Sequence, residues 1–274
     1  MTGIFRAACV QMRTGLDVAA NIAAAATLIR EAKKAGAALV ATPEMTSLFE
    51  AESDALFAKV KTEDDDVALK AFRALAAEES IWLLIGSLPI RVGERQCANR
   101  SFLLDPKGHI AAWYDKVHMF DVDLPGGETY RESRSYRRGD RAVVADLPWG
   151  KLGLSVCYDL RFPHLYRSLA KAGASFLSIP AAFTHTTGQA HWHVLQRARA
   201  IETGCFVIAP AQGGKHENGR HTFGHSLIVD PWGKILAEAG DEPGIIAADI
   251  DPAKVAEART RVPALTHDRP FTLA

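Results

Sequence analysis

Three residues with reactive side chains each follow an apolar segment of the chain. Cys157 stands in Gly-Leu-Ser-Val-Cys-Tyr-Asp-Leu-Arg-Phe-Pro, Glu44 follows Ala-Leu-Val-Ala-Thr-Pro, and Lys116 lies in Trp-Tyr-Asp-Lys-Val-His. Short apolar runs of this kind are typical of buried strands, and the carboxyl ends of such strands are where α/β proteins place functional side chains. A thiol, a carboxylate and an ammonium are the groups that acyl transfer needs as nucleophile, acid/base and oxyanion stabiliser.

Cys157 falls where an apolar strand ends and a helix is about to begin. The amides of a helix start would favour its thiolate, and the N–H of Tyr158 would be available to a developing oxyanion. A cysteine at a strand end is as often a buried core thiol, and this segment alone leaves both interpretations open.

Glu44 and Lys116 are weaker signals when each is taken alone. Partial burial would raise the pKa of Glu44 toward neutrality, which suits a general acid/base, but a glutamate here can also simply start a helix. An ammonium at Lys116 could stabilise an oxyanion and a nearby thiolate, although a lone lysine at a strand end is usually solvated. Their significance depends on their coming together with Cys157.

The three segments in this order, Pro-Glu, Tyr-x-Lys-x-His and Cys-Tyr-Asp-x-Arg-Phe-Pro, resemble the nitrilase (carbon–nitrogen hydrolase) superfamily over nearly the whole chain. The resemblance implies a catalytic triad of Glu44, Lys116 and Cys157, with a second glutamate at Glu132. It also implies an α/β fold, a four-layer αββα sandwich of two mixed β-sheets, and chemistry that requires no metal or organic cofactor.

Further segments resemble one amidase branch of that superfamily. They are Ala-His-Trp-His-Val-Leu-Gln-Arg, Ala-Gln-Gly-Gly-Lys-His and Gly-His-Ser-Leu-Ile-Val-Asp-Pro-Trp-Gly. The branch hydrolyses deaminated glutathione to 2-oxoglutarate and cysteinylglycine. An ω-amidase acting on 2-oxoglutaramate or another short-chain ω-amide is the alternative, and a catalytically inactive binding protein on the same fold is a third. His193 stands where many relatives carry glutamate.

The resemblance leads to a mechanistic hypothesis in which Cys157 attacks the amide carbonyl. Lys116 and the Tyr158 amide stabilise the oxyanion, and Glu132 positions Lys116 or the substrate. Glu44 protonates the departing amine and then activates the water that hydrolyses the thioester. We assign the substrate's α-keto carboxylate to a guanidinium fork and two nearby groups, namely Arg161, the Phe183 amide and the Thr187 hydroxyl.

The elements that must position these residues form two βαβ-like halves. Apolar runs predict strands over residues 4–11, 37–42, 81–87, 151–156, 175–179 and 205–209. Helical patterns cover 18–35, 67–80, 163–172 and 189–203, with Asp17 as N-cap and Gly36 as stop for the first. Strand pairs are expected at 100–105 with 109–114 and at 225–229 with 234–237, and loops at 120–140 and 213–221. No linker separates the halves, so one domain over 1–274 is expected.

Composition narrows the class of protein. The chain has 274 residues, 48% of them hydrophobic, with 32 basic and 32 acidic side chains, which excludes a largely disordered chain and gives no bulk charge for a polyanion. Four cysteines are too few for a disulfide scaffold, and Cys9 and Cys205 lie in apolar runs typical of core thiols, whereas Cys97 stays undecided. No apolar run reaches about 18 residues, so we expect a cytoplasmic protein with no membrane partner. A small-molecule amide substrate is what the family resemblance implies.

Two other clusters were weighed as binding sites. His185, His191 and His193 lack the spacing of a helical zinc pair and imply no third ligand, so no metal is expected. A run of arginines is interleaved with acidic residues, which favours a solvated or oligomer-facing loop over a nucleic-acid surface; it comprises Arg131, Arg134, Arg137, Arg138 and Arg141. The resemblance implies a homo-oligomer, a dimer or larger.

Overall fold

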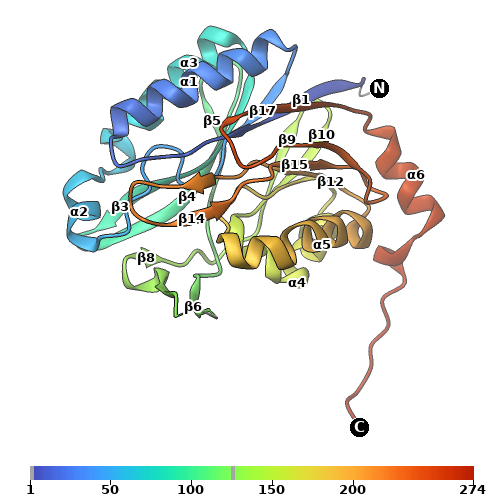
Figure 1. Ribbon diagram of the computed structural model, residues 1–274. Coiled ribbons are helices and arrows are strands. Elements are labelled where there is room, and N and C mark those ends of the chain that lie inside the picture. Colours follow the sequence, from blue (N-terminus) through green and yellow to red (C-terminus); the bar gives the residue numbers. More distant parts are fainter. Residues whose placement is uncertain (1–2, 125–126) are drawn as a thin grey trace.

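Two mixed sheets lie face to face in the computed structural model, which describes residues 3–124 and 127–274 (Figure 1). The first sheet has the order β17-β1-β2-β3-β4-β5, with β8 paired to β4. Its strands are β1 (Phe5–Gln11), β2 (Leu39–Ala41), β3 (Trp82–Gly93), β4 (Gln96–Leu104), β5 (Ile110–Asp115), β8 (Tyr136–Arg137) and β17 (Gly244–Ile250).

The second sheet repeats this plan with the order β16-β15-β12-β11-β10-β9. Its strands are β9 (Val143–Leu147), β10 (Gly150–Leu154), β11 (Ala174–Ser178), β12 (Phe206–Ala209), β15 (Leu227–Val229) and β16 (Ile235–Glu238). In each sheet three neighbouring strands run parallel, β1-β2-β3 in the first and β10-β11-β12 in the second, and antiparallel strands flank them. The parallel cores correspond to the two predicted βαβ-like halves.

Helices cover the outer face of each sheet and complete four layers. On β1, Ala8 and Val10 point outward and pack with residues of α1 (Val18–Lys34) and α3 (Val67–Glu79). Ala7 and Cys9 point inward and share a core with the second sheet, whose other face meets α4 (Pro163–Lys171) and α5 (His185–Thr203). Side chains of a strand alternate between its two faces, so both faces of β1 must be apolar. The predicted αββα sandwich is confirmed.

The predicted boundaries of α1 have clear physical causes. Asp17 caps the helix by accepting a 3.0 Å hydrogen bond from the Ala20 N–H, and Gly36 follows the helix with a φ of 88°. Glycine is favoured there because a side chain strains the left-handed conformation.

Several helices and strands were not predicted from the sequence. The edge strand β17 pairs antiparallel with β1, although nearly the whole chain separates the two strands in sequence. Pairing between such distant segments leaves no local pattern in the sequence. The predicted loops also contain short antiparallel pairs, and the helix expected at 189–203 begins at His185. Besides β17, the helices and strands not predicted are β8, β9, α2 (Ser53–Lys59), α6 (Ala253–Arg261), β6 (Asp121–Asp123), β7 (Thr129–Arg131), β13 (Gly213–Lys215) and β14 (His221–Phe223). Pro125 and Gly126 of the predicted 120–140 loop lie outside the described residues.

No helix among the described residues is both long enough and apolar enough to cross a bilayer.

Candidate active site

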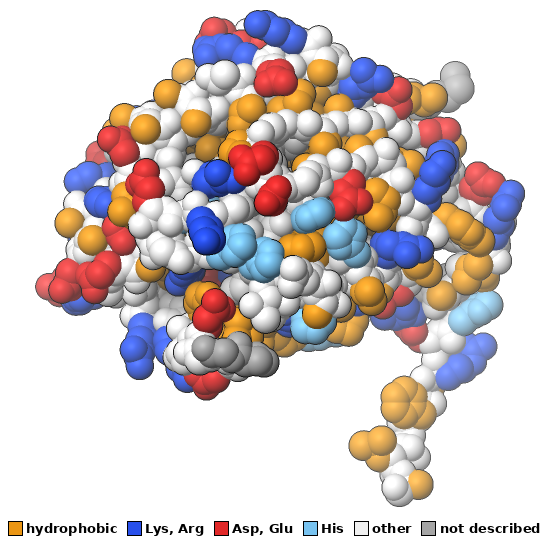
Figure 2. Space-filling model, viewed as in Figure 1, with side chains coloured by type: hydrophobic (Ala, Val, Ile, Leu, Met, Phe, Trp, Pro, Cys, Tyr) orange, Lys and Arg blue, Asp and Glu red, His pale blue; other side chains and the backbone are white. Residues whose placement is uncertain are grey.

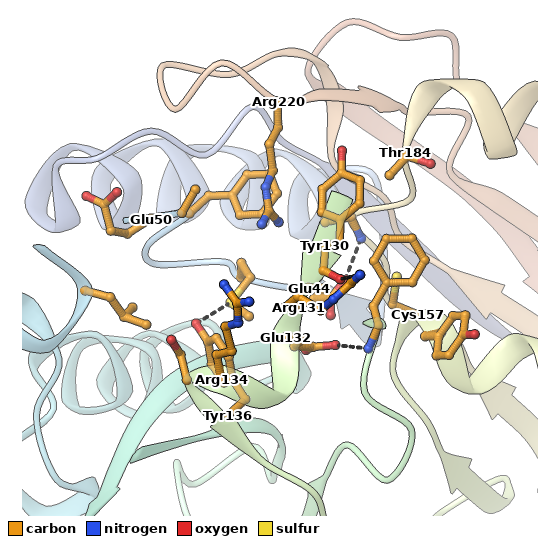
Figure 3. Close-up of a pocket in the computed structure, with 18 of the residues that line it drawn as sticks. Glu44, Glu50, Tyr130, Arg131, Glu132, Arg134, Tyr136, Cys157, Thr184 and Arg220 are labelled. Carbon is orange, nitrogen blue, oxygen red and sulfur yellow. Dashed lines mark hydrogen bonds between the residues drawn. The ribbon is translucent and has the colours of Figure 1, made fainter. Parts of the chain in front are cut away.

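A cavity of about 380 Å³ is lined by three of the predicted catalytic residues (Figure 3). Glu44 follows β2, Lys116 follows β5, and Cys157 comes shortly after β10. The first two belong to one sheet and the third to the other, so the cavity lies where the two sheets meet. The fold therefore brings the three side chains together although 113 positions separate Glu44 from Cys157 along the chain.

Lys116 is almost fully buried, and its ammonium is held between two carboxylates. Its Nζ donates to Glu44 Oε1 at 3.0 Å and to Glu132 Oε2 at 2.8 Å. Burial disfavours the charge of Lys116, but the charges of Glu132 and Glu44 outweigh it and raise its pKa well above the usual range. Lys116 is thus a fixed positive charge, and the contact with Glu132 is compatible with the predicted role of Glu132 in positioning Lys116.

Asn99 on β4 bridges the two glutamates and was not predicted. Its Nδ2 donates to Glu44 Oε1 at 2.8 Å and to Glu132 Oε1 at 3.1 Å. The side chain is fully buried, and its Oδ1 has no hydrogen-bond partner in the part of the chain that the structure describes. A buried asparagine in a mid-strand position of the segment Cys-Ala-Asn-Arg-Ser was the only signal available.

Glu44 is an ionised carboxylate with an unusually complete set of donors. Its Oε2 accepts a 2.8 Å hydrogen bond from the Ala182 N–H, and Gln212 Nε2 donates to its backbone carbonyl at 2.9 Å. Burial alone would raise the pKa of Glu44, as predicted. The charge of Lys116 and hydrogen bonds from Cys157, Lys116 and Asn99 outweigh burial and lower it instead, which corrects the expectation of a near-neutral pKa.

Cys157 is a neutral thiol in this arrangement. It begins the short 3₁₀ helix η3 (Cys157–Arg161) with a φ of 50°, and its N–H donates to Pro180 O at 2.8 Å. Burial and the negative charge of Glu44 raise the pKa of the thiol well above its usual range, although Lys116 opposes them. The expected stabilisation of a thiolate by helix amides is therefore wrong for the free enzyme, because the neighbouring carboxylate dominates. Glu44 is instead placed to take the thiol proton.

Asp159 joins the two segments that carry Lys116 and Cys157. It is fully buried and accepts a 2.7 Å hydrogen bond from the Tyr114 hydroxyl and a 2.9 Å bond from the Val156 N–H. His118 Nδ1 also lies 2.7 Å from its carboxylate. Tyr114 and His118 of the Tyr-x-Lys-x-His motif thus contact Asp159 of the Cys-Tyr-Asp motif. These contacts fix the position of Lys116 relative to Cys157.

Glu44, Lys116 and Cys157 form one end of the cavity, which we call the floor. The residues predicted to contact the substrate lie around it. Tyr158, Phe183 and Thr187 line the cavity. Arg161 does not line it but stands beside it, half-buried, with its guanidinium 5.1 Å from the centre of the Phe183 ring. Within residues 3–124 and 127–274 no carboxylate comes within salt-bridge distance of Arg161, and burial lowers its pKa. A half-buried guanidinium without a carboxylate partner can bind an anionic ligand.

A second arginine without a counter-ion, Arg220, lines the cavity away from Cys157 and was not predicted (Figure 3). Its guanidinium lies 5.2 Å from the centre of the Phe49 ring and 4.9 Å from that of Tyr130. None of the carboxylates in the described ranges forms a salt bridge with it. It belongs to the 213–221 loop region, where a lone arginine beside glycine carried no recognisable pattern.

The two other clusters from the sequence are split up by the fold. Arg131 pairs with Asp123 at 2.7 Å, Arg137 lies 3.8 Å from Asp115, and Arg141 lies 3.7 Å from Asp140. Arg131 and Arg134 line the cavity, which corrects the expectation of a solvated or oligomer-facing loop for this part of the run. The histidines likewise separate onto different neighbours: His185 stacks on His221, His191 lies 3.2 Å from Arg161, and His193 lies 2.8 Å from Glu238.

Comparison with known proteins agrees with this geometry. The family model described as carbon–nitrogen hydrolase matches residues 6–260. A Synechocystis protein named deaminated glutathione amidase is 43% identical over 267 residues, covering 96% of this chain and 97% of that protein. The human protein of the same name is 39% identical over 268 residues, covering 96% and 82%.

Solved structures show the same architecture. The C. elegans NitFhit protein has a TM-score of 0.90 at 36% identity, and the match covers 98% of this chain and 66% of that one. Saccharomyces cerevisiae Nit3, described as a member of branch 10 of the nitrilase superfamily, has a TM-score of 0.88 at 32% identity, covering 98% and 97%.

Proposed function

Because this chain belongs to the carbon–nitrogen hydrolase family and is an amidase, we propose that Cys157 cleaves deaminated glutathione to 2-oxoglutarate and cysteinylglycine. The observation that carries the proposal is a reactive floor accompanied by arginines that have no carboxylate partner in the described chain: Arg134 and Arg220 line the cavity, and Arg161 stands beside it. Such a cavity suits an amide with a carboxylate at each end. The names of the relatives from Synechocystis and human support the same substrate.

The first step forms the thioester. As Cys157 Sγ attacks the amide carbonyl, its proton passes to Glu44 and negative charge develops on the carbonyl oxygen. The ammonium of Lys116 and the N–H of Tyr158 stabilise this oxyanion. Glu44 then gives the proton to the amide nitrogen, the C–N bond breaks, and cysteinylglycine leaves as a neutral amine.

The second step regenerates the enzyme. Water attacks the thioester while Glu44 takes its proton, and collapse of the tetrahedral intermediate expels the Cys157 thiolate, which regains that proton. The product 2-oxoglutarate leaves from a site in which Arg161, Phe183 and Thr187 hold its α-keto carboxylate. Glu132 and Asn99 keep Lys116 and Glu44 in place, and each proton gained by Glu44 is returned within the cycle.

The decisive experiment compares kcat/KM for deaminated glutathione, 2-oxoglutaramate and an uncharged short-chain ω-amide on one preparation. We expect the order deaminated glutathione first, 2-oxoglutaramate second, the uncharged amide last, with Cys157→Ala inactive on all three. A higher kcat/KM for 2-oxoglutaramate would assign the enzyme to the ω-amidase alternative. Failure of all three substrates, with no acyl-enzyme detected by mass spectrometry, would favour the inactive binding protein.

Self-association and a cytoplasmic location remain predictions. Exposed apolar side chains near α5 and α6 support self-association, because a symmetric partner would remove them from water; they are Val194, Ile201, Trp232 and Val262. Sedimentation velocity of the full chain should show a dimer or larger species, and a monomer across the micromolar range would contradict the prediction.

A further inference from the structure

Two histidines and a glutamate meet on the surface outside the catalytic cavity. His193 comes from α5, His225 from the segment between β14 and β15, and Glu238 from the end of β16, and their ligand atoms all lie within 4.8 Å of one another. His193 Nε2 lies 2.8 Å and His225 Nδ1 2.9 Å from the same carboxylate oxygen. Figure 2 shows histidine side chains gathered on the face over α5 and β14. None of the three residues lines the cavity.

The backbone around His225 holds its imidazole in position. His225 has a φ of 54°, a conformation that non-glycine residues adopt only when their surroundings enforce it. Its N–H donates to Gly240 O at 2.8 Å, and its carbonyl accepts a 2.7 Å bond from the indole N–H of the fully buried Trp192. The ring stacks on Phe223 at 4.3 Å between centroids. The site is thus built before any ligand arrives, which lowers the entropic cost of binding one.

The three side chains combine burial with access. About a third of each side chain is exposed, 32% for His193, 30% for His225 and 35% for Glu238, so an ion and its remaining water ligands can reach them. Two imidazole nitrogens and one carboxylate oxygen form a ligand set that suits divalent zinc and its neighbours in the first transition row. The metal–ligand bonds of about 2.0–2.1 Å require only a small separation of atoms that are now in hydrogen-bond contact.

We propose that His193, His225 and Glu238 bind one divalent transition-metal ion of the zinc type, which ties α5 to β16 and to the segment before β15. The site does not depend on the amidase function, and the ion takes no part in the chemistry at Cys157. From the sequence, no metal is expected at His185, His191 and His193, and the fold places these three histidines against different neighbours. The proposed ligands His193 and His225 precede Glu238 by 45 and 13 positions along the chain, a spacing without a recognisable pattern.

Zinc binding to the tag-free full chain tests the proposal. The measurements are isothermal titration calorimetry and metal content after equilibrium dialysis, made on wild type and on Cys157→Ala so that the reactive thiol is not counted as a ligand. We expect one saturable zinc per chain in both, together with a rise in Tm. With Co²⁺ as the probe, visible absorption bands should report a site with nitrogen and oxygen ligands.

Three variants each remove one ligand: His193→Ala, Glu238→Gln and His225→Asn, the last because asparagine tolerates a positive φ. Each should weaken zinc binding by about tenfold or more while circular dichroism stays unchanged. His109→Ala is the matched control, because it deletes an exposed histidine that contacts a carboxylate, Asp105, at 3.3 Å without a third ligand. Equal zinc affinity in the ligand variants and in this control, or no saturable binding up to about 1 mM zinc, would overturn the proposal.

Discussion

The floor of the cavity and its mouth, where Arg220 lies, differ in whether their charged side chains have partners of opposite charge within the chain. On the floor, Lys116 and Glu44 are buried and pair with each other at 3.0 Å, and Glu132 and Asn99 complete the network. Toward the mouth, Arg220 is partly exposed and rests on aromatic rings with no carboxylate partner in the described chain. The charges of the floor are therefore paired without a ligand, whereas among the described residues the charge of Arg220 at the mouth is not. We infer that the floor determines the reaction and the mouth determines which amide undergoes it.

Removing the nucleophile is the strongest test of this division. Cys157→Ala should reduce kcat by roughly 10⁴-fold or more on every amide substrate, because no other group can form the thioester. KM for the preferred substrate should change far less, since the arginines remain. Measurable turnover close to that of wild type would show that the floor does not determine the reaction.

Glu44→Gln should have the next largest effect and carries a pH signature. Loss of the general base should lower kcat by about 10²–10⁴-fold. The charge of Glu44 raises the pKa of Cys157 in the wild type, so its removal lowers that pKa and leaves Lys116 to stabilise the thiolate. Alkylation of Cys157 by iodoacetamide should therefore begin at lower pH in the variant than in wild type, although the variant is less active. An unshifted alkylation profile would contradict the assigned coupling.

Arg220→Gln should change the preference between substrates and leave the reaction at the floor intact. A hydrogen bond to a charged group contributes about 1.5–3 kcal/mol, so kcat/KM for deaminated glutathione should fall roughly 10–100-fold. The value for 2-oxoglutaramate, which lacks the distal carboxylate, should hardly change. Arg138→Gln, at an exposed arginine that does not line the cavity, is the control. An equal loss for both substrates would mean that Arg220 supports the floor.

Tyr114→Phe should have the smallest effect and act on stability. It removes the hydroxyl that donates to Asp159 at 2.7 Å, which should lower the free energy of unfolding by about 1–3 kcal/mol in a urea titration. Tyr136→Phe is the matched control, since within the described residues its buried hydroxyl has only the weak acceptor Met45 Sδ as a partner, at 3.8 Å. A larger loss in Tyr136→Phe would indicate that Asp159 is not the residue that holds the two segments together.

The parallel cores could be predicted because buried parallel strands are continuous apolar runs, and Glu44 and Cys157 follow such runs. Lys116 follows the antiparallel strand β5, and only the family resemblance grouped it with Glu44 and Cys157 as a triad. The prediction that helices cover two mixed sheets depended on the family resemblance, and the packing of Ala8 and Cys9 on opposite faces of β1 bears it out.

What could not be predicted depends on contacts between distant segments. Asn99 is one polar residue within a strand, and only the fold shows that it faces both glutamates. The pKa directions of Glu44 and Cys157 depend on how burial balances against charges brought in by other strands, so residue type alone gave the wrong sign. Arg220 was missed for the same reason, because the aromatic rings that hold it come from residues 49 and 130.

Because the catalytic residues are divided between two sheets, the activity of the enzyme depends on how those sheets are aligned. The sulfur is carried by one sheet and the carboxylate and ammonium by the other, and a displacement of about 1 Å between reacting groups can cost on the order of 10²-fold in rate. We therefore expect apolar residues at the sheet interface to influence the catalytic rate without touching the substrate; Phe5 and Phe176, whose ring centroids lie 5.5 Å apart, are examples. Substitutions at these positions should reduce amidase activity while the chain remains folded. A screen for variants without activity should therefore identify core positions as well as residues that line the cavity.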